Sequence, residues 1–299
     1  MPDISIITPS LNQGRFIDRT IQSVLSQELC GAELEYLVVD GGSSDETLNI
    51  LQHYSNQLRW ISEPDAGQAD AVNKGLRSTS AEVIGWLNSD DVFCAGALRT
   101  IQQFFDEHPE VDVVYGDANH IDEDDAVIEP YYTERWDLER LKEVCYLCQP
   151  AVFFRRRVVN LAGALDTRLR FCMDYEYWLR LAQLGASFAY LRETLAGSRL
   201  YPQTKTLGSR RQVHAEMNDM LRVRLGRVPE RWIFNYAHVV LEPTRIRPEQ
   251  RLRFALALFG LSLYASLRWN RSVSLATLST TSAWIADSVR SDLRRVFAR

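Results

Sequence analysis

The sequence has few cysteines and no apolar run of membrane-spanning length. Five cysteines occur in 299 residues, an odd number, and the first residues, MPDISIITPS, are too short and polar for a secretory signal. We therefore expect a cytoplasmic protein with free thiols. Cys145 and Cys148 have CxxC spacing, but no second pair completes a zinc site, so buried structural thiols are expected.

Positive charge is also not in excess. The formal net charge is −5, which gives no reason to expect nucleic acid as the main partner. Apolar residues make up 46% and aromatics 10% of the chain, a composition typical of globular proteins. The length allows one large domain with an appendage, or two smaller domains.

Short β-branched runs alternate with helical patterns in the first part of the chain. Strands are predicted at 3–8, 35–40, 58–62 and 82–87, and helices near 14–27, 44–54 and 67–78. This alternation predicts an α/β fold with a mostly parallel, Rossmann-like sheet flanked by helices. In GGSSDETL, Ser43 and Glu46 have the spacing of a capping box for the next helix.

The pattern changes after residue 92. We expect a helix at 95–107, a strand at 111–116, a strand in QPAVFFRR, a helix in MDYEYWLRLAQLG and helices from about residue 210. The acidic run Asp122–Asp125 lacks the spacing and glycine of an EF-hand loop, so a solvated turn is predicted there.

Polar residues follow each of the first four predicted strands. These are Thr8–Asn12, Asp40, Glu63–Asp65 and Asn88–Asp91. Ligands bind outside the carboxyl ends of parallel strands, so the four loops together predict a site. Asp40 would accept a hydrogen bond from a base N–H or a ribose hydroxyl, or else cap the turn before Gly41.

The adjacent carboxylates of Asp90 and Asp91 have two interpretations. They either cap the following helix or hold a hard cation. Mg²⁺ and Mn²⁺ favour oxygen ligands and often share them with substrate phosphates, so the second interpretation predicts a metal-bound diphosphate.

Four motifs in this order resemble those of the family 2 glycosyltransferases: IITPSLN, LVVDGGSSDET, EPDAGQADAVNKG and WLNSDD. The resemblance covers about residues 3–205 and implies a GT-A fold. Most members of the family transfer the sugar with inversion at the anomeric carbon, so inversion is implied here too. The resemblance implies a catalytic domain at 1–209, with a donor half at 1–92 and an acceptor half at 93–209, followed by a helical region at 210–299.

The resemblance also assigns residues of the donor site. Pro9, Ser10, Asn12 and Asp40 would hold the nucleotide of a donor that is expected to be UDP-linked. Asp91 would be the direct ligand of Mn²⁺ or Mg²⁺, with Asp90 nearer the ribose or sugar.

One helix face adds candidates to this donor site. Asp70, Asn73 and Lys74 share it by their spacing. Lys74 would meet a phosphate or pair with Asp70, and Asp70 is a further candidate for a nucleotide or sugar contact.

An inverting transfer needs a base that takes the proton of the acceptor hydroxyl. CMDYEYWLRL resembles the acidic motif of the family, which implies Asp174 as the base and Glu176 as the alternative. Asp174 also fits a helix cap, and the two roles are compatible. Gln149 resembles part of an acceptor-side strand or satisfies backbone groups.

The segment Ser198–Thr206 departs from the family pattern. It places Tyr201 where related enzymes carry a histidine that closes over the metal. A metal ligand from this loop is therefore not expected, although Arg199 and Lys205 have the charge to clamp a diphosphate.

The implied function is metal-dependent sugar transfer to a glycan or lipid-linked acceptor, as in bacterial surface polysaccharide assembly. A sugar nucleotidyltransferase would need a glycine-rich basic loop after the first strand, and TPSLNQGRF lacks it. A catalytically silent binding or scaffold protein of the same fold would lack the metal pair or the base, and both are present.

The carboxyl-terminal tail lies outside the resemblance. RLRFALALFGLSLYASLRW contains an apolar stretch of about fourteen residues, short of the roughly 20 that span a bilayer. SAWIADSVRSDLRRVFAR is amphipathic and basic. The tail is expected either to pack as a bundle or homodimer contact, or to lie on the inner face of the cell membrane.

Overall fold

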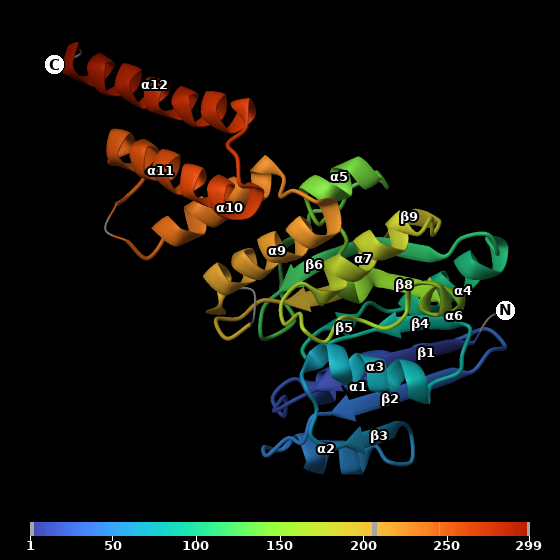
Figure 1. Ribbon diagram of the computed structural model, residues 1–299. Helices are drawn as coiled ribbons and strands as arrows, with labels where there is room; N and C mark the ends of the chain where they lie inside the picture. The colour runs from blue at the N-terminus through green and yellow to red at the C-terminus, as the bar shows by residue number, and fades with distance from the viewer. Residues whose placement is uncertain (1–2, 205–207, 245, 298–299) are drawn as a thin grey trace. The chain divides into compact units, whose positions relative to one another are not determined.

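The computed structural model describes residues 3–204, 208–244 and 246–297. The chain divides into two compact units. Met1–Leu141 and Cys145–Pro202 make up the first, and Lys142–Val144 and Gln203–Arg299 make up the second. Figure 1 shows a sheet with helices packed around it in the first unit and helices alone from α9 onward.

The first four strands form the parallel half of the sheet. They are β1 (Ile4–Ser10), β2 (Leu34–Asp40), β3 (Arg59–Ser62) and β4 (Val83–Trp86), in the order β3-β2-β1-β4. The helices between them are α1 (Ile17–Leu25), α2 (Thr47–His53) and α3 (Gln68–Ser78). Ser10 is paired with Asp40, and Asp40 with Ser62, so three strand ends lie side by side at one edge.

The remaining strands make the sheet mixed. In chain order the elements are β5 (Val92–Phe93), α4 (Ala97–Glu107), β6 (Val113–Ile121), β7 (Val127–Pro130), α5 (Leu138–Glu143), the 3-10 helix η1 (Gln149–Ala151), β8 (Val152–Arg155), α6 (Arg156–Ala162), α7 (Met173–Gln183) and β9 (Phe188–Arg199). The strand order continues β4-β8-β6-β9-β5, with β7 beside β6. β8 is antiparallel to both neighbours, whereas β9 is parallel to β6.

Both faces of β1 are covered. Ile4 and Ile6 belong to a core that includes apolar residues of α1 and α4. Ile7 lies against α3 at Gly75, where a Cβ atom would be only 2.3 Å from Ile7 Cγ2. α3 can therefore pack this close to β1 because position 75 has no side chain. A strand buried on both faces explains the continuous apolar run of β1.

The second unit consists of helices in the part of the chain that the structure describes. They are α9 (Arg210–Leu225), α10 (Glu230–Leu241), α11 (Arg251–Asn270) and α12 (Leu275–Phe297). Ala237, Leu241 and Leu258 are buried between helices, and Trp269 packs edge-on against Tyr236 at 4.7 Å. Among the described residues, no helix has both the length and the apolar character to cross a membrane.

The predicted α/β class and the order of strands and helices are confirmed, with the sheet all parallel in its first half and mixed in its second. The predicted capping box at Ser43 and Glu46 is wrong. The Ser43 hydroxyl donates to Asp40 Oδ1 at 2.5 Å, and α2 begins only at Thr47, whose N–H donates to Asp45. Gln149 lies in η1 rather than in the predicted strand.

Candidate active site

The loop after β1 is hydrogen-bonded to the loop after β2. The Asn12 N–H donates to Ser43 Oγ at 2.7 Å, and the Ser44 N–H donates to Asn12 Oδ1 at 2.9 Å. Gln13 N–H donates to Thr47 Oγ1 at 3.0 Å. Asn12 is exposed and has a left-handed backbone conformation with φ 52°. These contacts fix the two loops as one rim at the carboxyl edge of the sheet.

Asp40 lies beneath this rim and is fully buried. Its Oδ2 accepts hydrogen bonds from the N–H groups of Gly42 at 3.0 Å and Ser43 at 2.9 Å, and from the Ser62 hydroxyl at 2.7 Å. With the Ser43 hydroxyl on Oδ1, the carboxylate accepts four bonds from the protein. Asp40 therefore caps the turn, which is one of the two roles predicted for it.

Pro9 and Ser10, the last residues of β1, are both buried. Ser10 Oγ has no hydrogen-bond partner among the described residues, although the side chain is buried. Buried polar groups are nearly always paired in folded proteins, so this hydroxyl is a group that a ligand or an ordered water would satisfy.

The predicted face of α3 is held by contacts within the protein. Lys74 Nζ pairs with Glu63 at 2.8 Å and with Asp70 at the longer distance of 3.9 Å, and it donates to the Pro64 carbonyl at 3.1 Å. The hydrogen bond from Lys74 to Glu63 raises the pKa of Lys74. Asp70 accepts a hydrogen bond from the Ala66 N–H at 3.2 Å. Of the alternatives predicted for Lys74, carboxylate pairing is observed, with Glu63 as the nearer partner.

Asn73, the third residue of that face, is buried. Its side chain donates to the Leu165 carbonyl and accepts from the Leu165 N–H, both at 2.9 Å. Asn73 therefore ties α3 to the segment that leads into α7.

The aspartate pair lies where β4 ends. Asp91 is buried, and its oxygens accept hydrogen bonds from the Arg199 N–H at 2.9 Å and from Asn88 Nδ2 at 3.1 Å. Burial and the neighbouring charge of Asp90 raise the pKa of Asp91 to about 8. The pair does not cap α4, because β5 intervenes and Gly96 precedes that helix. Two carboxylates with too little compensating charge are a chemically suitable place for a cation.

Tyr201 orients Asp90. Its hydroxyl donates to Asp90 Oδ2 at 2.9 Å, and its ring packs on Phe16 at 4.9 Å. Burial and the Asp90 carboxylate raise the pKa of Tyr201, so the hydroxyl keeps its proton and remains a donor. The tyrosine thus supplies a hydrogen bond at the position where related enzymes are expected to carry a histidine.

Arg199 binds the loop that carries Asp90 and Asp91. Its Nε donates to the Asp90 carbonyl at 2.8 Å, and its guanidinium also contacts the Asp122 carbonyl and the Asp125 carboxylate. The residue is only 3% exposed. The predicted diphosphate clamp at Arg199 is therefore wrong, because its guanidinium is enclosed by protein groups. Lys205, the other predicted clamp, lies outside the described residues.

Asp174 lies in the first turn of α7, whose N-cap is Cys172. It therefore does not occupy the capping position, and it is partly exposed. Burial raises the pKa of the Cys148 thiol, and the charges of Asp91 and Asp174 raise it further. Both carboxylates therefore act electrostatically on one buried thiol.

Glu176, the alternative base, is almost completely buried. Arg180 donates to it from Nε at 3.1 Å and from Nη2 at 2.9 Å. Gln149 is likewise engaged, with its Nε2 donating to the Trp86 carbonyl at 2.5 Å, so it satisfies a backbone group. The geometry favours Asp174 over Glu176 as the group that an acceptor can reach.

A cation at this edge would depend on the aspartate pair and on the substrate. Among the described residues, no three His, Cys, Asp or Glu side chains are arranged to hold a metal ion. Mg²⁺ and Mn²⁺ are commonly held by one or two carboxylates together with substrate phosphates and water, which fits this donor set.

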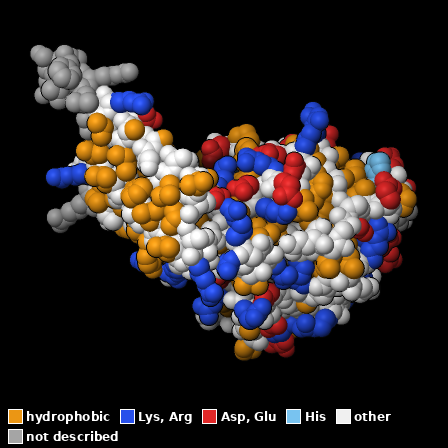
Figure 2. Space-filling model, turned by 45° about the horizontal axis from the view of Figure 1, so that its top comes forward, with side chains coloured by type: hydrophobic (Ala, Val, Ile, Leu, Met, Phe, Trp, Pro, Cys, Tyr) orange, Lys and Arg blue, Asp and Glu red, His pale blue; other side chains and the backbone are white. Residues whose placement is uncertain are grey.

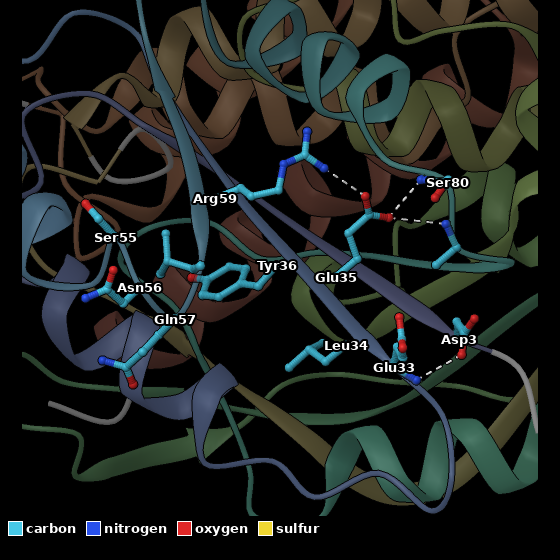
Figure 3. Close-up of a pocket in the computed structure, with 12 residues that line it drawn as sticks. Asp3, Glu33, Leu34, Glu35, Tyr36, Ser55, Asn56, Gln57, Arg59 and Ser80 are labelled. Atoms are coloured by element: carbon cyan, nitrogen blue, oxygen red, sulfur yellow. Dashed lines mark hydrogen bonds and ion pairs between the residues drawn. The ribbon is translucent and has the colours of Figure 1, made fainter.

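A pocket of about 520 Å³ lies at the opposite edge of the sheet (Figure 3). Its lining includes Glu35, Arg59 and Ser80 near the amino ends of the strands. Glu35 accepts hydrogen bonds from Arg59 at 3.0 Å and from the Ser80 N–H at 2.7 Å. Burial alone would raise the pKa of Glu35, but its hydrogen bonds lower it. The charges of Glu35 and Arg59 compensate each other. Open α/β sheets bind ligands at the carboxyl ends of their strands, not at the amino ends where this pocket lies.

The fold and this carboxyl edge define a glycosyltransferase of the GT-A class. Residues 5–161, more than half of the chain, match the family described as glycosyl transferase family 2. The chain belongs to this family.

Relatives agree with this assignment. A PGL/p-HBAD biosynthesis glycosyltransferase of Mycobacterium tuberculosis is 32% identical over 188 residues, which cover 60% of this chain and 69% of that protein. The structure of S. aureus TarS 1–349 in complex with UDP-GlcNAc has a TM-score of 0.63 at 18% identity, covering 96% of this chain and 89% of that one.

The longer TarS structure extends beyond this likeness, because the match spans 54% of it. A mannosyltransferase from Pyrobaculum calidifontis in complex with GDP-Man and Mn²⁺ has a TM-score of 0.57 at 15% identity, covering 96% of this chain and 81% of that one. At these identities the likeness to solved structures establishes the GT-A fold.

Proposed function

We propose that this glycosyltransferase moves a sugar from a UDP-sugar to a glycan or lipid-linked acceptor with inversion at the anomeric carbon. The observation that carries the proposal is the Asp90–Asp91 pair after β4, held by hydrogen bonds from Tyr201, Asn88 and the Arg199 N–H. We assign catalysis to residues 1–209, with the donor half at 1–92 and the acceptor half at 93–209.

Asp90 and Asp91 would hold Mn²⁺ or Mg²⁺, which would supply Lewis-acid stabilisation of the departing diphosphate. Tyr201 and Asn88 keep the two carboxylates in place. The acceptor oxygen forms a bond to the anomeric carbon as the bond to the diphosphate oxygen breaks. The acceptor proton passes to Asp174, and the bonding electron pair leaves with UDP.

A panel of nucleotide-sugars tests this proposal. A UDP-sugar with Mn²⁺ is expected to raise the Tm by about 5–10 °C at 100 times its Kd, because it binds only the folded chain. Slow release of UDP should follow by hydrolysis. GDP-Man and metal-free samples are the controls. A Tm shift without any release of UDP would favour the silent binding protein.

The second unit has a basic, partly apolar surface that supports a peripheral membrane contact. Residues 203–299 contain 17 Lys and Arg but seven Asp and Glu, a formal charge of +10 in a chain of net charge −5. On α11, Leu256, Tyr264 and Leu267 are about half exposed and share one face by helical spacing. Figure 2 shows hydrophobic side chains gathered on the helices of the second unit.

The arginines favour an anionic membrane over a second copy of the chain. Arg253 lies in the first turn of α11 and Arg271 directly after its last residue, and both are exposed. Anionic lipid would attract them, whereas a symmetric dimer through this face would bring like charges together. We therefore propose that α11 docks on the inner face of the cell membrane.

Full-length protein is expected to sediment with vesicles containing anionic lipid at low salt and to be released at high salt. Serine at Leu256, Tyr264 and Leu267 should weaken vesicle binding by about tenfold or more, since the inserted apolar area is lost. The matched control places serine at three exposed apolar residues of the first unit, Val127, Ile128 and Leu161. Dimers in light scattering without vesicle binding at any salt concentration would assign the face to self-association.

A further inference from the structure

We propose that Asp65, rather than Asp40, is the carboxylate that recognises the base of the donor nucleotide and selects uracil. The proposal rests on the proposed function, because it presupposes a nucleotide across the carboxyl edge of β1, β2 and β3. Asp40 is unsuited to this role because it is buried. That side chain has no exposed surface, and both of its oxygens already accept hydrogen bonds from the protein.

Asp65 lies directly above the residue that follows Asp40. The loop after β3 folds back over the Gly41 backbone, so that a Cβ atom on Gly41 would be 2.7 Å from Asp65 Oδ2 and 3.1 Å from its Cγ. The Asp65 carboxylate thus occupies the space that any side chain at position 41 would need. Glycine at position 41 is what admits a carboxylate from the neighbouring loop to this edge.

The carboxylate is oriented but not saturated. Asp65 Oδ1 accepts a hydrogen bond from the Gly67 N–H at 2.8 Å, whereas Oδ2 has no hydrogen-bond partner in the described part of the chain. Asp65 is also partly exposed, in contrast to Asp40. The nearby cation, Lys74, forms its ion pair with Glu63 at 2.8 Å. One carboxylate oxygen is therefore left to accept a hydrogen bond from a ligand.

A second group beside Gly41 points to the same place. The Gly41 N–H donates to the Ser10 carbonyl at 2.8 Å, which puts Ser10 next to Gly41. The hydroxyl of Ser10 is the buried oxygen without a partner described above. An acceptor at Asp65 and an unsatisfied hydroxyl at Ser10 are thus adjacent to one glycine, and this combination fits a polar ligand better than a packing role.

The chemistry of the base decides what such a site prefers. Uracil carries an N3–H donor, which a carboxylate oxygen accepts in a charge-assisted hydrogen bond. Cytosine has an acceptor nitrogen at the same ring position, so it would face the carboxylate with two acceptors opposed. Asp65 therefore favours UDP over CDP.

Calorimetric titration of the full-length chain with UDP and with CDP, both with Mn²⁺, tests the inference. The natural chain should bind UDP more tightly. Asp65→Asn should weaken UDP binding by about 10- to 100-fold, because a charge-assisted hydrogen bond is lost. CDP binding should stay equal or tighten, since the asparagine amide can donate to cytosine N3.

Two further variants separate base recognition from folding. Gly41→Ala leaves the Asp65 side chain intact but takes its space, so it should also reduce the preference for UDP. Glu33→Gln removes the same charge from an exposed residue at the opposite ends of the strands and should leave the ratio of the two Kd values unchanged.

The outcomes are distinct. If Asp65→Asn weakened the binding of UDP and of CDP equally, or if the natural chain bound both equally, the proposed role of Asp65 in base recognition would be overturned. A natural chain that binds UDP tightly while Asp65→Asn keeps its full preference would do the same. If the natural chain bound no nucleotide, the proposed function would fall first, and this inference with it.

Discussion

Asp91→Asn is expected to lower sugar transfer by about three decades, because a bound cation stabilises the departing diphosphate by several kcal/mol. Asparagine keeps the size of the side chain but removes the charge that would attract the cation. The chain should still fold. Burial and the neighbouring Asp90 carboxylate raise the pKa of Asp91, so its charge is not a source of stability without a cation.

UDP release from a UDP-sugar with Mn²⁺ measures the loss, and EDTA should reproduce it in the natural chain. Mn²⁺ should raise the Tm of the natural chain in the presence of UDP but not that of the variant. Asp124→Asn is the matched control, since Asp124 is exposed in the acidic turn after β6. Full activity in metal-free buffer would contradict a metal at this pair.

Asp174→Asn is expected to lower kcat by about two to four decades, which is the usual contribution of a general base. The Kd for UDP should hardly change, because Asp174 would meet the acceptor hydroxyl rather than the donor. Pre-steady-state transfer and calorimetric titration with UDP measure the two quantities separately. If the affinity for UDP fell as steeply as kcat, Asp174 would belong to the donor site.

Glu176→Gln is the control on the same helix. Glu176 is paired with Arg180 at 2.9 Å inside the protein, so the substitution should lower the Tm while the folded fraction keeps its kcat. The opposite result, with Asp174→Asn active and Glu176→Gln inactive at the same folded fraction, would assign the role of the base to Glu176.

Much of the fold was predictable because local sequence carries it. The apolar runs of β1 and β2 match strands buried on both faces, and the helices between them follow the expected periodicity. The antiparallel pairing of β8 with β4 was not predictable, because it joins Val83 to Arg155 across the chain. No local pattern records such a pairing, which is decided by how the second half of the sheet packs.

Within the site, the same division holds. The sequence alone determined the polar strand ends, the Asp90–Asp91 pair and the acidic start of the helix at Asp174. Only the tertiary structure decided which of these side chains remain available. The hydrogen bonds to Asp40 come from the loop after β2 and from the end of β3, and Arg199 is bound by the Asp90 carbonyl and by the acidic turn. The physical reason is that a polar group's capacity to bind a ligand depends on the hydrogen bonds it already makes. Some of the partners lie far away in the sequence, such as Ser62 for Asp40 and Asp122 for Arg199.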